Sequence, residues 1–115
     1  NGTINNYSHM PMRRLDITVD VEYGTSSEKT CELLQTLIKQ DDRILTAETS
    51  DKADPFVALS SLKDSSIQFV VRVWVKSEDY WDVNYDLLKK IYEELPKNGV
   101  QFPYPKLDIN ILNRN

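Results

Sequence analysis

The segment from Ser65 to Val75 reads SSIQFVVRVWV, and it determines how the rest of the chain can fold. Hydrophobic side chains occupy every second position within it: Ile67, Phe69, Val71, Val73 and Val75. In an extended backbone alternate residues point to the same side, so these five share one face of a strand. The other face is mixed, because Val70 and Trp74 alternate there with polar residues. Such a strand is expected in the middle of a sheet that helices cover on one side.

Two further strands are predicted from the same kind of pattern. Residues 14–23 alternate strictly, and their apolar members are Leu15, Ile17, Val19, Val21 and Tyr23. This alternation predicts a strand with one buried face and one solvated face. Residues 56–62 predict another strand, and the polar residues 63–65 are expected to turn the chain directly into the 65–75 strand as a hairpin.

Two segments carry apolar residues at helical spacing. The first follows Ser26 or Ser27, either of which can cap a helix, and is expected to end near Gln40. Its apolar stripe consists of Leu33, Leu34, Leu37 and Ile38. The second is expected to begin with Ser77 as its cap and to end at Pro96 and Asn98-Gly99. Its expected stripe consists of Trp81, Leu87 or Leu88, Ile91 and Leu95, flanked by Val83, Tyr85 and Tyr92.

The order strand, helix, strand, strand, helix, strand predicts an α+β fold, a ferredoxin-like split βαβ two-layer sandwich. We assign residues 13–105 to this domain and interpret residues 1–12 as the end of a preceding module plus a linker. Residues 106–115 hold a last short strand and a tail. This strand follows a core that is already complete, so it is expected to need a partner from another chain.

Composition and charge limit the classes of function. The 115 residues carry a net charge of −4, which argues against binding to nucleic-acid phosphates and against a polybasic membrane patch. Cys31 is the single cysteine, so an internal disulfide is excluded and a reducing compartment is the natural expectation. The chain has no spanning run of about 18 apolar residues. Its first residues read as the middle of a protein, so we expect a piece of a longer chain.

Residues suited to catalysis or metal binding are few and scattered. His9, the single histidine, lies in a polar connector where a solvated side chain is expected. Cys31 is expected to be a buried, inert thiol. The acidic pairs at 41–42 and 78–79 fit helix ends better than a cation site, because no loop supplies the roughly six or more oxygen ligands of Ca²⁺. We therefore predict no enzymatic activity, no metal and no cofactor.

Four stretches together resemble the C-terminal cytoplasmic region of the bacterial mechanosensitive channel of small conductance family. They are YSHMPMRRLDITVDVEYGTS at 7–26, SSIQFVVRVWV at 65–75, WDVNYDLLKKIYEEL at 81–95 and NGVQFPYPKLDINI at 98–111. Four features occur in the order and spacing of the family: the Arg13-Arg14 step before the first strand, SSI at 65–67 leading to VRVW at 71–74, YDLL at 85–88 and FPYP at 102–105. The resemblance extends from about Gly2 to Ile111 and is weakest at residues 46–55.

This resemblance implies a homoheptameric channel in the bacterial inner membrane, whose transmembrane helices form a tension-gated pore that releases solutes on osmotic downshock. The present chain would contribute to a cytoplasmic vestibule. Residues 2–7 would be the last strand of a β-domain and residues 13–105 an α/β domain. Residues 107–112 would form a strand of an inter-subunit β-barrel, with Leu107, Ile109 and Ile111 on one face of it.

The resemblance also implies side portals, through which ions and small solutes enter, where the two domains meet. Arg13, Arg14 and Asp16 would lie near these portals and influence which ions pass, because charges at a low-dielectric opening focus the potential. A simple pairing of Arg14 with Asp16 on the solvated face of the sheet accounts for these residues equally well.

Two other functions are weighed against the channel. A ligand-sensing ferredoxin-like regulatory domain would hold a metabolite in a pocket between subunits. A small enzyme of the acylphosphatase kind would need an anion-binding loop with an arginine after the first strand, and residues 24–27 (GTSS) contain none. The vestibule domain is the predicted function, and the regulatory domain is the alternative.

Overall fold

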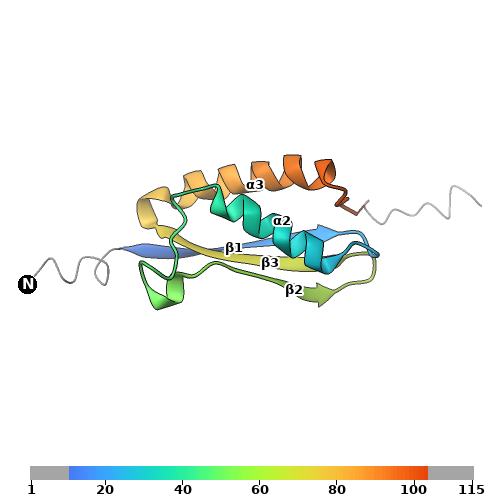
Figure 1. Ribbon diagram of the computed structural model, residues 1–115, viewed down its shortest axis with the longest axis horizontal. Helices are drawn as coiled ribbons and strands as arrows, with labels where there is room; N and C mark the ends of the chain where they lie inside the picture. The colour runs from blue at the N-terminus through green and yellow to red at the C-terminus, as the bar shows by residue number, and fades with distance from the viewer. Residues whose placement is uncertain (1–10, 104–115) are drawn as a thin grey trace, which may run out of the picture.

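The computed structural model describes residues 11–103 of the chain. This part contains a three-stranded antiparallel sheet with two helices on one of its faces (Figure 1). In chain order the elements are β1 (Met12–Val21), α2 (Ser27–Lys39), the 3₁₀ turn η2 (Asp51–Ala53), β2 (Phe56–Leu62), β3 (Ile67–Lys76), the 3₁₀ turn η3 (Ser77–Asp79) and α3 (Tyr80–Lys97). No helix within residues 11–103 combines the length and the apolar character that a bilayer crossing requires.

β3 occupies the centre of the sheet, with β1 on one side and β2 on the other. Both neighbours are antiparallel to β3, which makes them parallel to each other with β3 inserted between them. This is the arrangement of a split βαβ unit, so the predicted fold class and the central position of this strand are confirmed. The predicted hairpin of β2 with β3 is confirmed as well. The predicted sixth strand, residues 107–112, lies outside the described residues.

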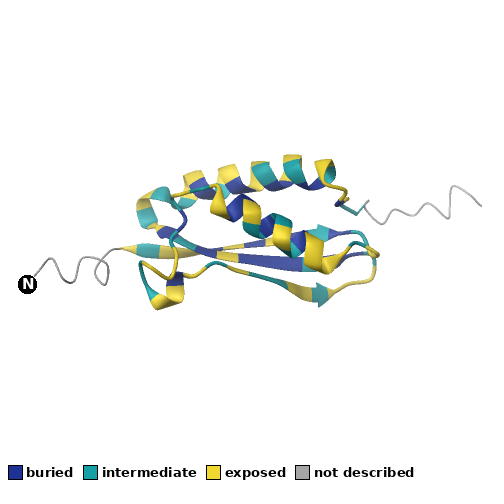
Figure 2. Cartoon of the chain, viewed as in Figure 1, coloured by how far each residue is buried: buried dark blue, intermediate teal, exposed yellow. Residues whose placement is uncertain are grey.

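The apolar face of β3 is the centre of the hydrophobic core. All five of its predicted residues are buried: Ile67, Phe69, Val71, Val73 and Val75. Burial of a large apolar side chain contributes roughly 1.5–3 kcal/mol before conformational entropy is subtracted. The inner faces of both helices pack on this surface, as the buried stripes in Figure 2 show. β1 adds Leu15, Ile17, Val19 and Val21 to the same core.

α2 begins and ends where its sequence predicts. The side chain of Ser26 caps it by accepting a hydrogen bond from the backbone N–H of Lys29 at 3.2 Å. Leu34, Leu37 and Ile38 are buried against the sheet, and Leu33 is partly buried. The chain then returns to the sheet, because buried Ile44 forms a bridge with Val75.

α3 buries Leu87, Ile91 and Leu95 as predicted, but the first position of the predicted stripe is wrong. Its buried residues are Val83, Leu87, Ile91 and Leu95, whereas Trp81 is 56% exposed. The prediction that Trp81 belongs to the core is therefore wrong, and Val83 takes its place. The reason is the helical period: a residue four positions from Leu87 lies on the same face, whereas one six positions away lies well to the side.

Two other predicted details, the cap of α3 and the burial of Tyr23, are also corrected. Ser77 is not the cap of α3, because it begins the preceding 3₁₀ turn and donates its backbone N–H to the carbonyl of Pro11 at 3.0 Å. The predicted end of α3 is confirmed: Pro96 lies inside its last turn, the helix ends at Lys97, and Asn98 and then Gly99, with a φ of +84°, follow. Tyr23 is exposed rather than buried, because β1 ends at Val21, where the chain turns away from the sheet.

The adjacent leucines of α3 provide a direct test of the observed helix face. Leu87 is 2% exposed and Leu88 is 44% exposed. Leu87→Ala is expected to lower the free energy of unfolding by about 2–5 kcal/mol, because it leaves a cavity in the core. Leu88→Ala should lower it by no more than about 1 kcal/mol. Urea denaturation followed by circular dichroism measures both, and equal losses would contradict this assignment of the buried face.

Candidate functional site

The face of the sheet opposite the helices is open, and it carries most of the charged candidate residues. From β1 it presents Arg14, Asp16, Thr18 and Asp20, which lie in register with Trp74, Arg72, Val70 and Gln68 of β3. Residues directly opposite each other in antiparallel strands point to the same face, so the two rows form one surface. Val70 is buried even here, which gives this surface an apolar centre between charged ends.

Arg14 and Asp16 form a paired charge at one end of this face. Arg14 Nε lies 3.0 Å from Asp16 Oδ1, and Arg14 Nη2 donates to Asp16 Oδ2 at 3.1 Å. Arg72 Nε, on the neighbouring strand, approaches Asp16 Oδ1 to 3.9 Å. Exposed ion pairs between side chains this accessible to solvent contribute about 0–1 kcal/mol to stability. These ion pairs therefore add little to the stability of the fold. They place two arginines and one aspartate side by side on the surface of the sheet.

Arg13 is separated from this pair by the strand itself. Successive residues of a strand point to opposite faces, so Arg13 lies on the helix side of the sheet. Its guanidinium carbon is 3.7 Å from the ring centroid of Tyr80, the first residue of α3. A cation–π contact of this kind is worth about 0.5–1 kcal/mol at an exposed site. The three predicted portal residues therefore do not form one cluster: Arg14 and Asp16 lie together, and Arg13 attaches α3 to β1.

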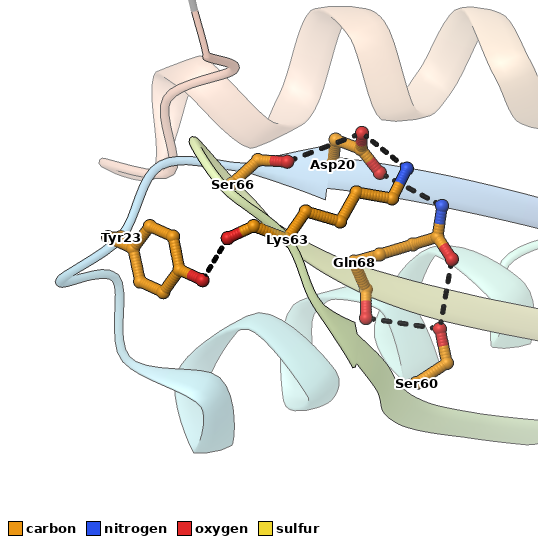
Figure 3. A network of polar contacts seen from close by, with 6 residues as sticks. All are labelled: Asp20, Tyr23, Ser60, Lys63, Ser66 and Gln68. Carbon is orange, nitrogen blue, oxygen red and sulfur yellow. Dashed lines mark hydrogen bonds and ion pairs between the residues drawn. The ribbon is translucent and has the colours of Figure 1, made fainter.

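A second polar network, which the sequence did not predict, lies at the other end of the open face (Figure 3). The Asp20 carboxylate accepts hydrogen bonds from Lys63 Nζ at 3.2 Å, Ser66 Oγ at 3.4 Å and Gln68 Nε2 at 3.2 Å. The Tyr23 hydroxyl donates to the backbone carbonyl of Lys63. The network joins β1 to the turn between β2 and β3. The alternating pattern of β1 predicted that Asp20 lies on the solvated face. The hydrogen-bond partners of Asp20 lie more than 40 residues away in sequence, so the pattern did not predict them.

Two cations on or beside the open face lie close to aromatic rings. Lys52 Nζ is 5.0 Å from the ring centroid of Trp74, and the guanidinium of Arg72 is 5.8 Å from that of Phe56. Within residues 11–103 no group of three or more His, Cys, Asp or Glu side chains is placed to hold a metal ion. What the open face offers is a surface of alternating charges and aromatic rings, which can attract ions or a polar partner.

A third charged cluster lies on the helix layer instead. Arg43, in the loop after α2, donates from Nη2 to Asp41 Oδ2 at 2.7 Å and to Asp86 Oδ2 of α3 at 2.8 Å. Arg43 also donates from Nε and from its backbone N–H to Asp41 Oδ1. These hydrogen bonds lower the pKa of the Asp41 carboxyl and raise that of the Arg43 guanidinium. The cluster therefore connects the two helices at one end of the helix layer.

Cys31 is partly buried rather than fully buried as predicted, and it packs against the edge of the core. Burial raises the pKa of its thiol, which reduces the thiolate fraction at neutral pH. This is the behaviour expected of a packing residue. The predicted barrel residues Leu107, Ile109 and Ile111, and also His9, lie outside the described residues.

Known proteins match this chain along most of its length. The family described as mechanosensitive ion channel MscS, C-terminal, matches residues 15–102. A small-conductance mechanosensitive channel of Edwardsiella ictaluri is 33% identical over 110 residues, which cover 96% of this chain and 37% of that protein. An uncharacterised MscS family protein of Buchnera aphidicola subsp. Acyrthosiphon pisum is 35% identical over 113 residues, covering 98% of this chain and 35% of that protein.

A solved structure has the same fold. The crystal structure of Helicobacter pylori MscS in its closed state superimposes with a TM-score of 0.74 at 28% sequence identity. The match covers 86% of this chain and 38% of that one. The present chain thus spans between about a third and two fifths of the length of each of these relatives.

Arg43→Gln is expected to lower the free energy of unfolding by about 1.5–3 kcal/mol at neutral pH, because it removes charge-assisted hydrogen bonds to two carboxylates. The loss should depend on pH. The pKa of Asp41 is lower in the folded than in the unfolded protein, so its contribution is present above the unfolded value and disappears as the pH falls through the folded value. The difference between wild type and variant should therefore shrink below about pH 4.

The exposed pair on the sheet gives the matched control for this measurement. Arg14→Gln should lower the free energy of unfolding by no more than about 1 kcal/mol. Urea denaturation between pH 3 and pH 7 compares the two variants. A difference for Arg43→Gln that stays constant over this range would contradict the role assigned to Asp41.

Proposed function

The chain belongs to the MscS family of mechanosensitive ion channels, and we propose that it forms the cytoplasmic vestibule portion of a tension-gated channel in a bacterial inner membrane. The observation that carries this proposal is the continuous match of residues 15–102 to the C-terminal domain of the family. The match spans the described fold from β1 to Phe102. Since the chain spans only part of its relatives, pore and tension sensing would belong to the rest of the parent protein.

In this proposal the domain acts through its surfaces rather than by catalysis. Residues 1–12 would end a preceding β-domain, residues 13–105 would form the α/β domain, and residues 106–115 would supply the barrel strand and a tail. Subunits would assemble as a homoheptamer around a hollow vestibule. Ions and small solutes would enter through side portals, and opening of the pore would release solutes during osmotic downshock.

The charge row on the open face supports a role at the portals. Arg14 and Asp16 lie near the start of β1, at the end of the domain where the chain enters from residues 1–12. With Arg72 they leave one positive charge in excess on the exposed surface. A fixed charge beside a narrow opening biases the local concentration of small ions, within a Debye length of about 10 Å at 0.1 M salt. Arg13 faces the helix layer and contacts the Tyr80 ring. Its role would therefore be to position α3 against β1 rather than to attract ions at the portal.

The pattern of the last residues supports assembly through a shared barrel. Leu107, Ile109 and Ile111 alternate with polar residues, which gives a strand with one apolar face. Strands from several copies that close into a barrel bury such faces together and leave no free sheet edge.

Patch-clamp recording of the full-length parent protein in liposomes tests the channel function and the portal charge together. Suction is expected to open a current. Arg14→Glu should change the ratio of anion to cation permeability by a factor of about two or more at low salt, because it reverses a charge beside the opening. The effect should be much smaller at 1 M salt, where the Debye length is about 3 Å.

Lys29→Glu is the matched control, because it makes the same charge change at an exposed site on the helix layer. It should leave the permeability ratio unchanged. A parent protein that carries no tension-gated current would contradict the channel function. A normal current with an unaltered ratio in Arg14→Glu would contradict only the placement of this residue at a portal.

Truncation of the parent protein after Pro105 is expected to weaken assembly, because it removes Leu107, Ile109 and Ile111. Size-exclusion chromatography with light scattering in detergent should then show a loss of oligomer mass, or oligomer dissociation at lower temperature. Truncation after Leu112 keeps Leu107, Ile109 and Ile111 and serves as the control. An oligomer of unchanged mass and stability after the longer truncation would exclude the barrel role.

A further inference from the structure

Among the described residues, the large hydrophobic side chains that remain exposed gather in two places. The first group lies on α3 and comprises Trp81, Tyr85, Leu88 and Tyr92, which are 44% to 71% exposed. The second group lies on and beside β2 and comprises Tyr23, Phe56, Leu59 and Leu62, which are 42% to 70% exposed. Single exposed hydrophobic residues are common, but clusters of this size on a small domain indicate contact surfaces.

The first group forms a continuous stripe, which we call the α3 flank. Its members follow one another at intervals of four, three and four residues, so they line up along one side of the helix. With about 100° of rotation per residue, this side lies roughly 110° from the buried stripe. Asp86, on the other side of α3, pairs with Arg43 of the loop after α2. The α3 flank therefore faces away from α2. None of its four members is charged.

The α3 flank lies above β1, which is an edge strand of the sheet within residues 11–103. Leu88 and Tyr92 line a shallow depression of about 290 Å³ together with Phe102 and with Thr18, Val19 and Asp20 of β1. The Tyr92 ring is stacked on the Phe102 ring, with centroids 6.5 Å apart. At the other end of the stripe, the rings of Trp81 and Tyr85 lie 5.9 Å apart. Ring-to-ring contacts within the flank restrict these side chains before any partner binds, which lowers the entropy lost on binding.

The second group lies at the opposite edge of the sheet. Leu59 and Leu62 are in register with Phe69 and Ile67, whose side chains belong to the core. They therefore point toward the helix layer. They remain exposed because β2 is an edge strand that α2 covers only in part, as Figure 2 shows for this strand. Tyr23, which bonds to the carbonyl next to Leu62, extends the same surface. We call Leu59, Leu62 and Tyr23 the β2 edge.

We propose that the α3 flank of one copy of this domain packs against the β2 edge of the next copy in a ring. β1 and β2 form opposite edges of the sheet. The α3 flank belongs to the helix layer above β1, and Leu59 and Leu62 of the β2 edge point toward the same layer. Two different patches on opposite sides of a subunit produce a head-to-tail contact, which closes into a ring when the rotation permits. The inference rests on the proposed homo-oligomeric channel and specifies the surface that its subunits share.

The size and chemistry of the α3 flank fit a second copy of the domain. Aromatic residues bury about 150–250 Å² each, so at the observed exposures the flank offers on the order of 500 Å². A stable interface buries about 800 Å² per partner, so this contact would act together with other contacts in the same assembly. A stripe that is uncharged and rich in aromatic residues is best buried against another apolar surface. Trp and Tyr are among the residues that contribute most to the binding energy of protein interfaces. The β2 edge supplies apolar side chains of that kind.

Cysteine cross-linking in the purified full-length protein, with Cys31→Ser and any other reactive cysteines removed, tests the contact. Two double variants place one cysteine on each surface: Tyr85→Cys with Leu62→Cys, and Leu88→Cys with Leu59→Cys. A bismaleimide is expected to convert at least one of them into a ladder of covalent oligomers. Each single variant should remain uncross-linked, because a head-to-tail contact does not bring identical residues together. Tyr85→Cys with Glu32→Cys, on the exposed side of α2, is the matched control and should also give no ladder.

The alternative outcomes are distinguishable by light scattering on the same samples. Dimers formed by a single variant would show a two-fold contact and overturn the inference. The absence of cross-links in both pairs, with the oligomer mass intact, would overturn the shared surface and leave the proposed channel standing. A monomeric full-length protein would contradict the proposed assembly itself and, with it, this contact.

Discussion

The burial of the apolar face of β3 is the constraint on which the rest of the structure depends. Phe69, Val73 and Val75 are completely inaccessible to solvent, and this requires both helices on one side and a strand on each edge. A shift of one residue in the pairing would turn every one of these side chains to the open face, so the same burial also determines the register. The positions of the charged side chains on the open face of β1 follow from that register, because Asp16 and Asp20 each lie between two buried residues and Arg14 directly precedes one.

Both helices cover the same face of the sheet, and this determines the character of the remaining surfaces. Neither described helix covers the open face, so its charged side chains pair with their neighbours at the surface, as Arg14 does with Asp16 and Lys63 with Asp20. The helix layer contains two helices over three strands and leaves apolar side chains uncovered at both sheet edges. The domain therefore has one charged, open surface and apolar side chains at both edges of its sheet. This division suits a wall element of a larger assembly, which is the function we propose.

Much of the fold could be predicted from the sequence, and the errors have identifiable causes. The ranges of β2 and α2, the hairpin and the central strand are confirmed, because each rests on a local period that burial reinforces. The error at Trp81 arose because both Trp81 and Val83 are apolar enough to begin the buried stripe of α3. Hydrophobicity alone favoured the larger residue, whereas the angular position of Val83 decided the packing. Less of the candidate site was predictable: Arg13 and Arg14 are adjacent in sequence, yet the strand places them on opposite faces.

The sequence by itself determined which residues form strands and helices and, for β1, β3 and α2, which face of each is buried. Side-chain periodicity is a property of the local backbone, and it does not depend on what the element packs against. Only the tertiary structure decided the partners of Asp20, Arg13 and Arg43 and the apolar side chains that stay exposed at the two edges of the sheet. These depend on strand order, on register and on how far two helices reach across three strands. Each of those features arises from contacts between segments that lie far apart along the chain.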